Sequence, residues 1–311
     1  MVPYSPAVTE HRGITYQAAG GARRLDIYLP PGRAASAEDP LPVVFWVHGG
    51  AWISGSRHNV APYLRMLAAR GFAAVGVDYS LAPGGVYPKA LLELNTAMRF
   101  LKDHAGDYGL DMNRVVLAGD SAGAQLAAQL AAAASSPEYA AQLGFTPALA
   151  RRHLRGALLH CGVYDLRSME KLTGVVGWGF RTALWAYTGQ RRFSQSTAAE
   201  QMSVMTHAAA GFPPVFISGG NGDGLTSRQS VPFADRLEDL GVAVTRRFWP
   251  QDLTPALPHE AQFQFSRPEA HAVLEETEDF LNSVLRRRPE DPAGHNFAEI
   301  TSVQPAERSP A

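Results

Sequence analysis

The stretch RVVLAGDSAGAQLAAQLAAAA, residues 114–134, contains the feature that decides the fold. Its first half is a short apolar run typical of a buried strand, and its second half is a helical pattern that begins at Ala122. At the junction, Gly119 and Gly123 flank Ser121 in a G-x-S-x-G pattern. A sharp strand-to-helix turn needs small flanking residues, because neighbouring backbone comes too close for a Cβ atom. We therefore predict a turn that exposes the Ser121 hydroxyl oxygen at the carboxyl end of a strand, beside the N–H group of Ala122.

Short β-rich runs alternate with longer helical patterns along the whole chain. Strands are expected at residues 25–29, 43–47, 73–77, 114–117, 156–159, 215–218 and 242–248, and helices at 60–69, 88–104, 122–134, 226–240 and 268–287. This alternation predicts an α/β fold whose mostly parallel central sheet carries helices on both faces. No internal repeat and no Gly/Ser linker divides the chain, so we expect one domain over residues 1–288. The polar, proline-bearing stretch 289–311 is expected to be a disordered tail.

A second glycine-bearing motif, HGGAW at 48–52, follows the strand expected at 43–47. Glycines directly after a strand let the main chain turn its N–H groups toward a pocket, where they can stabilise a negatively charged oxygen. We expect Gly49, Gly50 and Ala122 to form such an oxyanion hole, with Ala51 as a further donor. His48 is expected to anchor this loop through a hydrogen bond instead of carrying protons.

Three motifs together resemble the hormone-sensitive-lipase-like esterase branch of the α/β-hydrolase superfamily. They are HGGAW at 48–52, DYSLAPGGVYPKAL at 78–91 and GDSAG at 119–123. The chain departs from the branch at Ala51, which replaces a third glycine, and at Ser80, which replaces an arginine. The resemblance implies an α/β-hydrolase fold with a small lid insertion, and a serine carboxylesterase that acts on small to medium acyl esters through an acyl-serine intermediate.

The resemblance also implies a catalytic triad in the chain order nucleophile, acid, histidine. Asp223 lies in a glycine-rich loop after the strand at 215–218, and His259 lies in the loop after the last strand. In this arrangement His259 takes the proton of Ser121, and Asp223 holds the imidazole in the useful tautomer. His160 also ends a strand, but its place in the chain order does not fit the base.

Two acidic neighbours of these residues have expected supporting roles. Asp120 resembles the acid that braces the loops in this family and would hydrogen-bond to nearby backbone. Glu260 follows the base directly and could be a supporting group or an exposed side chain.

Residues 164–212 interrupt the alternation of strands and helices and carry several aromatic side chains. An aromatic insertion between two strands is a candidate lid over a pocket, which makes Trp52, Trp178 and Trp185 candidate pocket residues, although Trp52 could equally pack in the core. No long amphipathic helix is evident in this stretch, which argues against activity at a lipid interface.

Three alternatives to ester hydrolysis remain open on these residues. An arylformamidase-like amide hydrolase would use the same triad, and an acyltransferase would replace water by an alcohol. A non-catalytic small-molecule receptor is disfavoured, because Ser121, Asp223 and His259 are all present.

Composition restricts the partners and the location. The chain has 28 Lys and Arg against 29 Asp and Glu, a formal charge of -1, which argues against nucleic acid and an anionic membrane. Its single cysteine, Cys161, excludes an internal disulfide and is expected to be a small buried residue.

No leader-like segment or long apolar run is present, so a cytoplasmic location is expected. No nucleotide or metal-binding motif occurs, so we expect no cofactor and no metal, a small-molecule ester as the partner, and a chain free to form a homo-oligomer.

Overall fold

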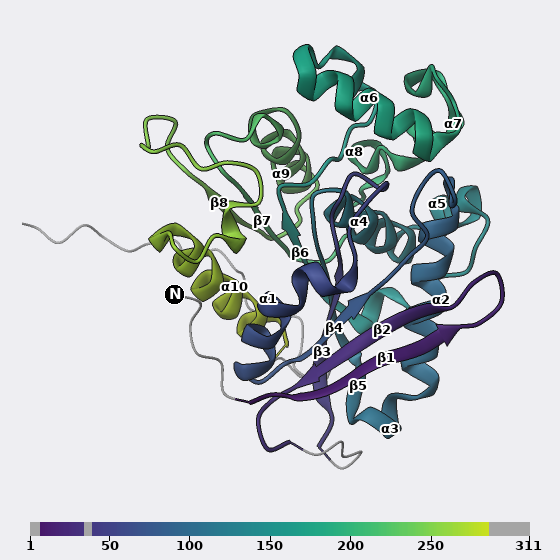
Figure 1. Cartoon of the computed structure of the whole chain (residues 1–311), viewed down its shortest axis with the longest axis vertical. Coiled ribbons are helices and arrows are strands. Elements are labelled where there is room, and N and C mark those ends of the chain that lie inside the picture. Colours follow the sequence, from purple (N-terminus) through teal and green to yellow (C-terminus); the bar gives the residue numbers. More distant parts are fainter. Residues whose placement is uncertain (1–6, 34–38, 286–311) are drawn as a thin grey trace, which may run out of the picture.

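The computed structural model describes residues 7–33 and 39–285, so the tail expected at 289–311 lies outside the described residues. The described chain folds around an eight-stranded sheet with the strand order β1-β2-β4-β3-β5-β6-β7-β8 (Figure 1). The strands are β1 Thr9–Gln17, β2 Arg23–Leu29, β3 Leu41–Val47, β4 Ala73–Val77, β5 Leu110–Asp120, β6 Leu154–His160, β7 Val215–Gly219 and β8 Val244–Phe248. The α-helices are α1 Arg57–Ala69, α2 Lys89–Asp103, α3 Ala105–Tyr108, α4 Ala122–Ser135, α5 Pro137–Leu143, α6 Gly174–Thr188, α7 Thr197–Met202, α8 Val204–His207, α9 Val231–Asp239 and α10 Pro268–Leu285.

Strands β3 to β8 are parallel to one another, and the sheet turns antiparallel where β2 pairs with β4 and β1 pairs with β2. This arrangement confirms the predicted α/β class and its mostly parallel sheet. Strand β1 was not predicted from the sequence. It is an edge strand whose residues are mostly exposed or half-buried, so its sequence TEHRGITYQ carries little apolar alternation.

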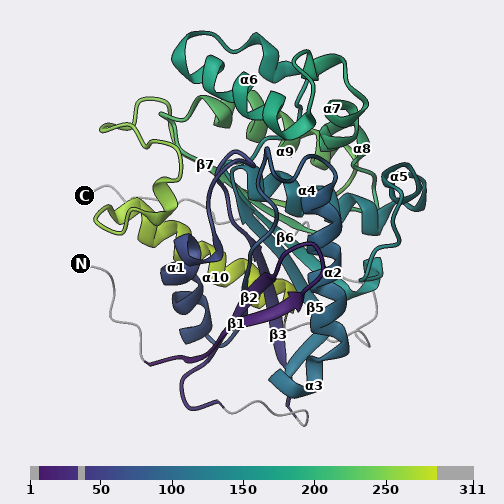
Figure 2. The ribbon, with the colours of Figure 1, turned by 45° about the vertical axis from the view of Figure 1, so that its right-hand side comes forward.

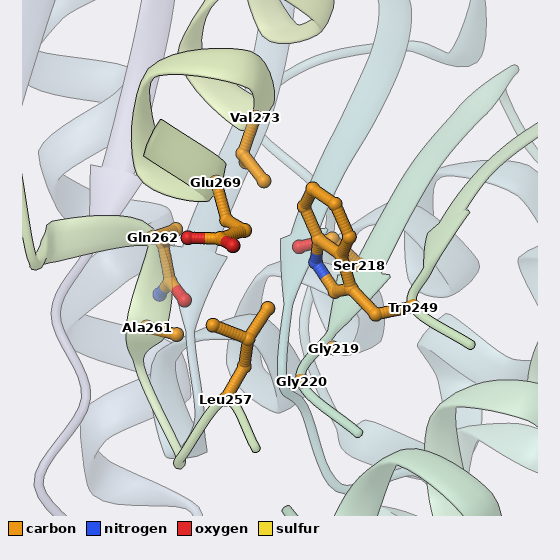
Figure 3. A pocket seen from close by; sticks show the side chains of 9 residues that line it. All are labelled: Ser218, Gly219, Gly220, Trp249, Leu257, Ala261, Gln262, Glu269 and Val273. Atoms are coloured by element: carbon orange, nitrogen blue, oxygen red, sulfur yellow. The ribbon is translucent and has the colours of Figure 1, made fainter. Parts of the chain in front are cut away.

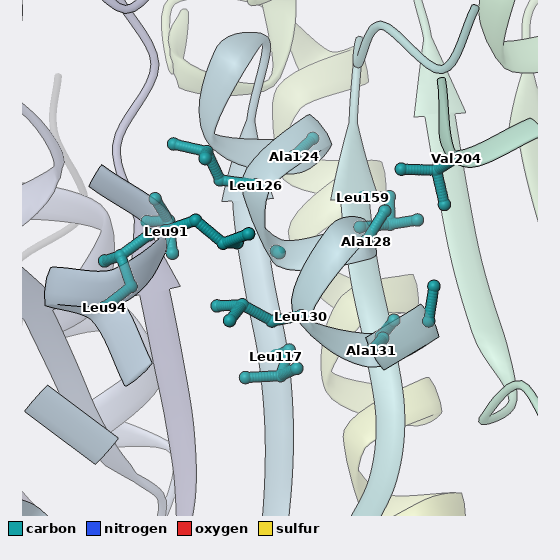
Figure 4. Close-up of a cluster of buried hydrophobic side chains, with 14 of the residues drawn as sticks. Leu91, Leu94, Leu117, Ala124, Leu126, Ala128, Leu130, Ala131, Leu159 and Val204 are labelled. Carbon is teal, nitrogen blue, oxygen red and sulfur yellow. The ribbon is translucent and has the colours of Figure 1, made fainter. Parts of the chain in front are cut away.

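Alternating side chains of the central strand β5 divide the core into two layers. Val115 and Leu117 face a layer that contains α2, α4 and α9, and Val116 and Ala118 face a layer that contains α1 and α10. The close-up of the first layer shows leucines of α4 and α2 gathered around Leu117 (Figure 4). Helix α4 is buried along nearly its whole length, which explains its apolar composition on all sides. The helix that follows Ser121 is therefore firmly held by the core.

The insertion between β6 and β7 forms α6, α7 and α8, which lie above the carboxyl end of the sheet (Figures 1 and 2). Helix α6 spans 15 residues, although no such helix was evident from the sequence. In the described parts of the chain, no helix is both long and apolar enough to cross a membrane.

A largely buried group of charges connects β2, α1 and the loop after β4. The Arg57 guanidinium forms an ion pair of 2.9 Å with Asp26, a fully buried carboxylate of β2, and also pairs with Asp78. The neighbouring Tyr79 stacks on His48 at 4.4 Å between ring centroids and donates its hydroxyl to the His48 carbonyl oxygen at 2.8 Å. The ion pairs thus hold the loop against which the glycine motif at 48–52 packs.

We predict that Arg57→Leu lowers the free energy of unfolding by about 3 kcal/mol, because it removes the nearest and most buried counter-charge of the Asp26 carboxylate and leaves only Arg12 and His58, at 3.9 and 3.7 Å. Urea denaturation followed by circular dichroism measures this change. Arg246→Leu is the matched control: Arg246 pairs with Asp235 and Glu238, whose side chains are 57% and 48% exposed, so it should cost less than about 1 kcal/mol. Equal losses for the two variants would contradict a special role for the buried group.

Candidate active site

Ser121 lies at the sharp turn between β5 and α4, with backbone angles φ 52° and ψ −119°. This conformation is strained for any residue other than glycine, and it persists because the surrounding structure holds it. The Ser121 N–H group donates to the His160 carbonyl oxygen at 2.9 Å. A Cβ atom at Gly123 would overlap the Val47 carbonyl oxygen, so the turn requires glycine at that position. The residue is 6% exposed.

Three side chains from three separate loops form a chain of hydrogen bonds at the carboxyl end of the sheet. His259 Nε2 lies 3.0 Å from Ser121 Oγ, and His259 Nδ1 lies 2.7 Å from Asp223 Oδ2. The second oxygen of Asp223 accepts the N–H group of Leu225 at 2.9 Å. Asp223 is 8% exposed, whereas the His259 side chain is 35% exposed, so the site opens on the histidine side.

The glycine-rich loop after β7 holds the histidine loop in place. Asn221 accepts the Leu257 N–H group at 2.8 Å and donates to the Leu253 carbonyl oxygen at 2.9 Å. The Gly222 N–H group donates to the Leu257 carbonyl oxygen at 2.9 Å. These contacts fix the loop just before His259 relative to the loop that carries Asp223.

Cys161 is the neighbour of this site that sequence reasoning missed, since only a small buried residue was expected there. It follows β6 at a positive φ of 43°, and its sulfur, an Asp223 oxygen and a His259 ring nitrogen all lie within 4.8 Å of one another. Burial raises the pKa of the Cys161 thiol. Burial alone lowers the pKa of His259, but the charge and hydrogen bond of Asp223 act in the opposite direction, so the pKa of His259 is raised.

The atoms of Cys161, Asp223 and His259 also have the types and spacing of a metal-ligand set. The Asp223 and His259 atoms are, however, already used in the hydrogen-bond chain. A metal bound there would compete with the contact between His259 and Asp223.

Asp120, which precedes Ser121, bridges the two glycine motifs. It accepts the Gly49 N–H group at 2.8 Å through Oδ2 and the Trp46 indole N–H at 2.8 Å through Oδ1. The Gly49 N–H group is thus taken by Asp120 and does not point at an oxyanion, unlike in the sequence-based expectation. Within the described ranges, the N–H groups of Gly50, Ala51 and Ala122 have no hydrogen-bond partner and remain available.

Three successive residues of the HGGAW loop have positive φ angles: 111° at Gly50, 52° at Ala51 and 61° at Trp52. This backbone conformation orients the N–H groups of Gly50 and Ala51. A Cβ atom at Gly50 would overlap the Ser54 carbonyl oxygen, so only glycine fits there. Ala51 keeps its methyl group in a conformation that alanine tolerates at a modest cost. His48 is buried, and its Nδ1 lies 2.8 Å from the Gly49 carbonyl oxygen, an anchoring contact.

Glu260 lies beside both the base and Asp120. Its Oε1 atom is 3.8 Å from His259 Nε2, and the residue has a positive φ of 58°. Burial, together with the nearby Glu260 charge, raises the pKa of Asp120 to about 7. Glu260 is therefore a partly exposed neighbour of both His259 and Asp120.

Ser80 stands where the related branch carries an arginine, and Arg23 supplies a guanidinium at this place. The Ser80 hydroxyl donates to the buried Glu93 carboxylate at 2.7 Å, and Arg23 of β2 donates to Ser80 Oγ at 2.7 Å. Arg23 also pairs with Glu93 at 3.3 Å. A guanidinium from another strand thus reaches the same buried acid.

Of the three tryptophans expected at the pocket, one is buried and two are exposed on α6. Trp52 is fully buried, donates to Gln125 at 3.2 Å and stacks on Tyr187 at 5.5 Å, so it packs the insertion onto the body. Trp178 and Trp185 are 64% and 48% exposed on α6. His160, the competing histidine, lies under the site: burial lowers its pKa to about 3, and its Nδ1 is 2.6 Å from Ser218 Oγ.

A cavity of about 10 Å³ lies behind the loops that carry Asp223 and His259. Figure 3 shows Trp249 and Gln262 facing it from opposite sides, with Leu257 and Val273 closing its other two sides. This volume holds roughly one water molecule and is too small for an ester. The cavity is therefore not a substrate pocket.

Comparison with known proteins gives a consistent set of relatives. The BD-FAE family model matches residues 25–237. Esterase LipQ of Mycobacterium tuberculosis is 29% identical over 293 residues, which cover 92% of this chain and 65% of LipQ. Carboxylesterase NlhH of the same species is 37% identical over 125 residues, 39% of this chain and 38% of NlhH. The chain spans less than two thirds of the length of these curated relatives.

Solved structures show the same fold. Esterase B from Lactobacillus rhamnosis matches with a TM-score of 0.77 at 24% identity, and the match covers 91% of this chain and 87% of the esterase B chain. An esterase from Pyrobaculum calidifontis matches with a TM-score of 0.71 at 23% identity, and the match covers 91% of this chain and 87% of that esterase. These likenesses confirm the α/β-hydrolase fold expected from the sequence.

The hydrogen bond between Asp223 and His259 predicts a shift in the pH dependence of activity. Only neutral His259 can accept a proton, so activity falls as pH drops through the pKa of His259, and a negative neighbour that raises this pKa moves the fall to higher pH. We expect Asp223→Asn to lower kcat/KM and to move its acid limb to lower pH, because the carboxylate charge beside the imidazole is removed. Cys161→Ser, which replaces one uncharged group by another, is the control and should leave the acid limb in place. An unchanged acid limb in Asp223→Asn would contradict this role of the carboxylate.

Proposed function

Because the chain belongs to the BD-FAE family, we propose that it is a carboxylic-ester hydrolase that acts on small to medium acyl esters through an acyl-serine intermediate. Family membership agrees with the resemblance to hormone-sensitive-lipase-like esterases that the three sequence motifs carry. The observation that supports the mechanism best is the hydrogen-bond chain from Ser121 through His259 to Asp223, with distances of 3.0 and 2.7 Å.

In the proposed acylation step, Ser121 Oγ attacks the ester carbonyl carbon while His259 Nε2 takes the hydroxyl proton. The imidazolium that forms is stabilised by the Asp223 carboxylate, which also keeps the Nδ1 proton in place without accepting it. When the tetrahedral intermediate collapses, His259 returns the proton to the leaving alcohol, and the acyl group stays on Ser121.

The negative charge of the tetrahedral oxygen needs donors that are already oriented. Ala122 and Gly50 supply N–H groups without competing partners among the described residues, and Ala51 supplies a third. Loss of one such donor typically costs roughly 100- to 1000-fold in rate. The Gly49 N–H group contributes indirectly, because its bond to Asp120 fixes the loop that carries the other donors.

Deacylation repeats the same steps with water as the nucleophile. His259 removes a proton from water, the water oxygen attacks the acyl carbon, and the proton returns to Ser121 Oγ as the acid leaves. The exposed side of His259 is the side from which water can enter.

We predict that Ser121→Ala lowers kcat/KM for a p-nitrophenyl ester by roughly 10⁴- to 10⁶-fold, because no acyl-enzyme can form. Ser135→Ala, a serine at the far end of the same helix, is the matched control and should keep full activity. Circular dichroism establishes that both variants are folded. A folded Ser121→Ala protein that retained most of its activity would overturn the proposal.

A matched panel tests the substrate class. We expect p-nitrophenyl esters from acetate to palmitate to give a rate maximum at the short chains, with an aryl formamide hydrolysed much more slowly. A preference for the formamide would make the protein an amide hydrolase, and a lack of turnover of every compound would point to a receptor. Partition of the acyl group toward added alcohol would indicate acyl transfer.

A further inference from the structure

Most of the large exposed apolar side chains lie on α6 or on loops that contact it. Among the described residues, six large hydrophobic side chains are exposed: Ile53, Val86, Leu92, Val175, Trp178 and Trp185. Three of them belong to α6. Ile53 and Val86 lie on loops that reach α6, because Trp52 stacks on Tyr187 at 5.5 Å and the Tyr87 N–H group donates to the Tyr187 carbonyl oxygen at 2.8 Å. Concentrated exposed apolar surface of this kind marks a binding surface more often than chance exposure does.

The spacing of α6 places its apolar residues on two opposite sides. Leu184 and Tyr187 are fully buried against the body. Val175, Trp178 and Trp185 lie three and seven residues apart, which is the spacing of one helix face, and are 85%, 64% and 48% exposed. We call this second side the outer face of α6. Both ribbon views place α6 at the outermost edge of the molecule (Figures 1 and 2).

Within the stretch of chain between Glu170 and Glu200, which contains α6, all charged side chains are positive. Between Glu170 and Glu200 the sequence contains four basic residues, Lys171, Arg181, Arg191 and Arg192, and no acidic residue. None of the four forms an ion pair within the described parts of the chain. The bordering Glu200 forms an ion pair of 3.2 Å with Arg167. Arg191 lies over the Trp185 ring at 5.9 Å. The overall charge of -1 therefore hides a local cationic segment.

We propose that the outer face of α6 binds an anionic lipid–water interface. Tryptophan side chains favour the headgroup region of a lipid layer, and flanking arginine and lysine side chains are attracted to anionic headgroups. The exposed apolar face supplies the first element, and the four unpaired cations supply the second.

A second copy of this chain fits the outer face less well. In a two-fold contact each surface meets its own copy, so the four cations of one chain would face the four cations of the other, with Glu170 and the already paired Glu200 as the bordering acids. A lipid surface offers the opposite charge instead. The expectation that no anionic membrane is a partner rested on charge averaged over the whole chain, which does not report local segregation.

The position of α6 gives this surface a consequence for the substrate. Helix α6 follows β6, and Ser121, Asp223 and His259 follow β5, β7 and β8 at the same end of the sheet. Binding through α6 would bring the catalytic end of the molecule to the lipid, so esters dissolved in that lipid would be preferred. This consequence rests on the proposed function, whereas the binding itself does not.

Cosedimentation with sonicated vesicles tests the binding without any ester. We expect the wild-type protein to bind phosphatidylcholine vesicles that contain phosphatidylglycerol, to bind pure phosphatidylcholine vesicles more weakly, and to be released by added salt. Arg191→Glu with Arg192→Glu, and separately Trp178→Ser with Trp185→Ser, should each weaken binding on the order of tenfold or more.

A matched control carries the same charge changes elsewhere. Lys102→Glu with Arg152→Glu reverses two exposed charges near the amino ends of β5 and β6, opposite α6. This variant should bind as the wild type does. Two results would overturn the proposal: no binding to anionic vesicles, or equal binding by the α6 variants and the control. A third result would assign the outer face to a second copy of the chain: the wild-type protein is a dimer that does not bind vesicles, and Trp178→Ser with Trp185→Ser converts it to a monomer. Vesicle binding by a protein that hydrolyses no ester would leave this proposal standing and overturn only the proposed function.

Discussion

The buried carboxylate of Asp120 is the contact on which the geometry of the site depends. It is next to Ser121 in sequence, and it accepts one hydrogen bond from the backbone of Gly49 and one from the indole of Trp46, both at 2.8 Å. The turn that presents the serine and the loop that presents the N–H donors are thereby fixed to one side chain. Burial makes such a charge costly, so its hydrogen bonds must all be kept, and Glu260 at its side raises its pKa further. The requirement for an intact Asp120 environment also explains why Gly49 cannot donate to a substrate.

The sequence was sufficient for the features that are set locally. A sharp turn needs Gly119 and Gly123 around Ser121. Asp223 and His259 were expected near Ser121 because the resemblance implies a chain order for the triad and parallel strands deliver their following loops to the same end of the sheet. Other contacts between residues distant in sequence, to which neither a local rule nor the resemblance refers, could not be predicted. The bond from Gly49 to Asp120, the approach of Cys161 to His259 and the Arg23 contact with Ser80 each join separate strands or loops, and no spacing rule reports them. Strand β1 and helix α6 were missed because their apolar residues do not form a single buried stripe.

The distribution of apolar and charged groups separates two tasks within one fold. The core layers on both faces of the sheet hold the strand ends in fixed positions, which favours a site whose distances are already close to those needed for proton transfer. The insertion above them is attached through buried aromatic contacts such as Trp52 with Tyr187, and it turns its remaining tryptophans outward among unpaired cations. The proposed binding of α6 to lipid would bring esters from a lipid layer to these catalytic groups.

In the proposed mechanism Ser121 carries the acyl group during turnover. Intact-mass spectrometry of protein quenched in acid within milliseconds of mixing with excess p-nitrophenyl acetate, followed by peptide mapping, tests this step most directly. We expect one added acetyl group per chain, located on the peptide that contains Ser121, together with a burst of p-nitrophenol of about the same stoichiometry. An active protein that shows neither a burst nor an adduct, or an adduct on another residue that forms and decays at the turnover rate, would contradict it.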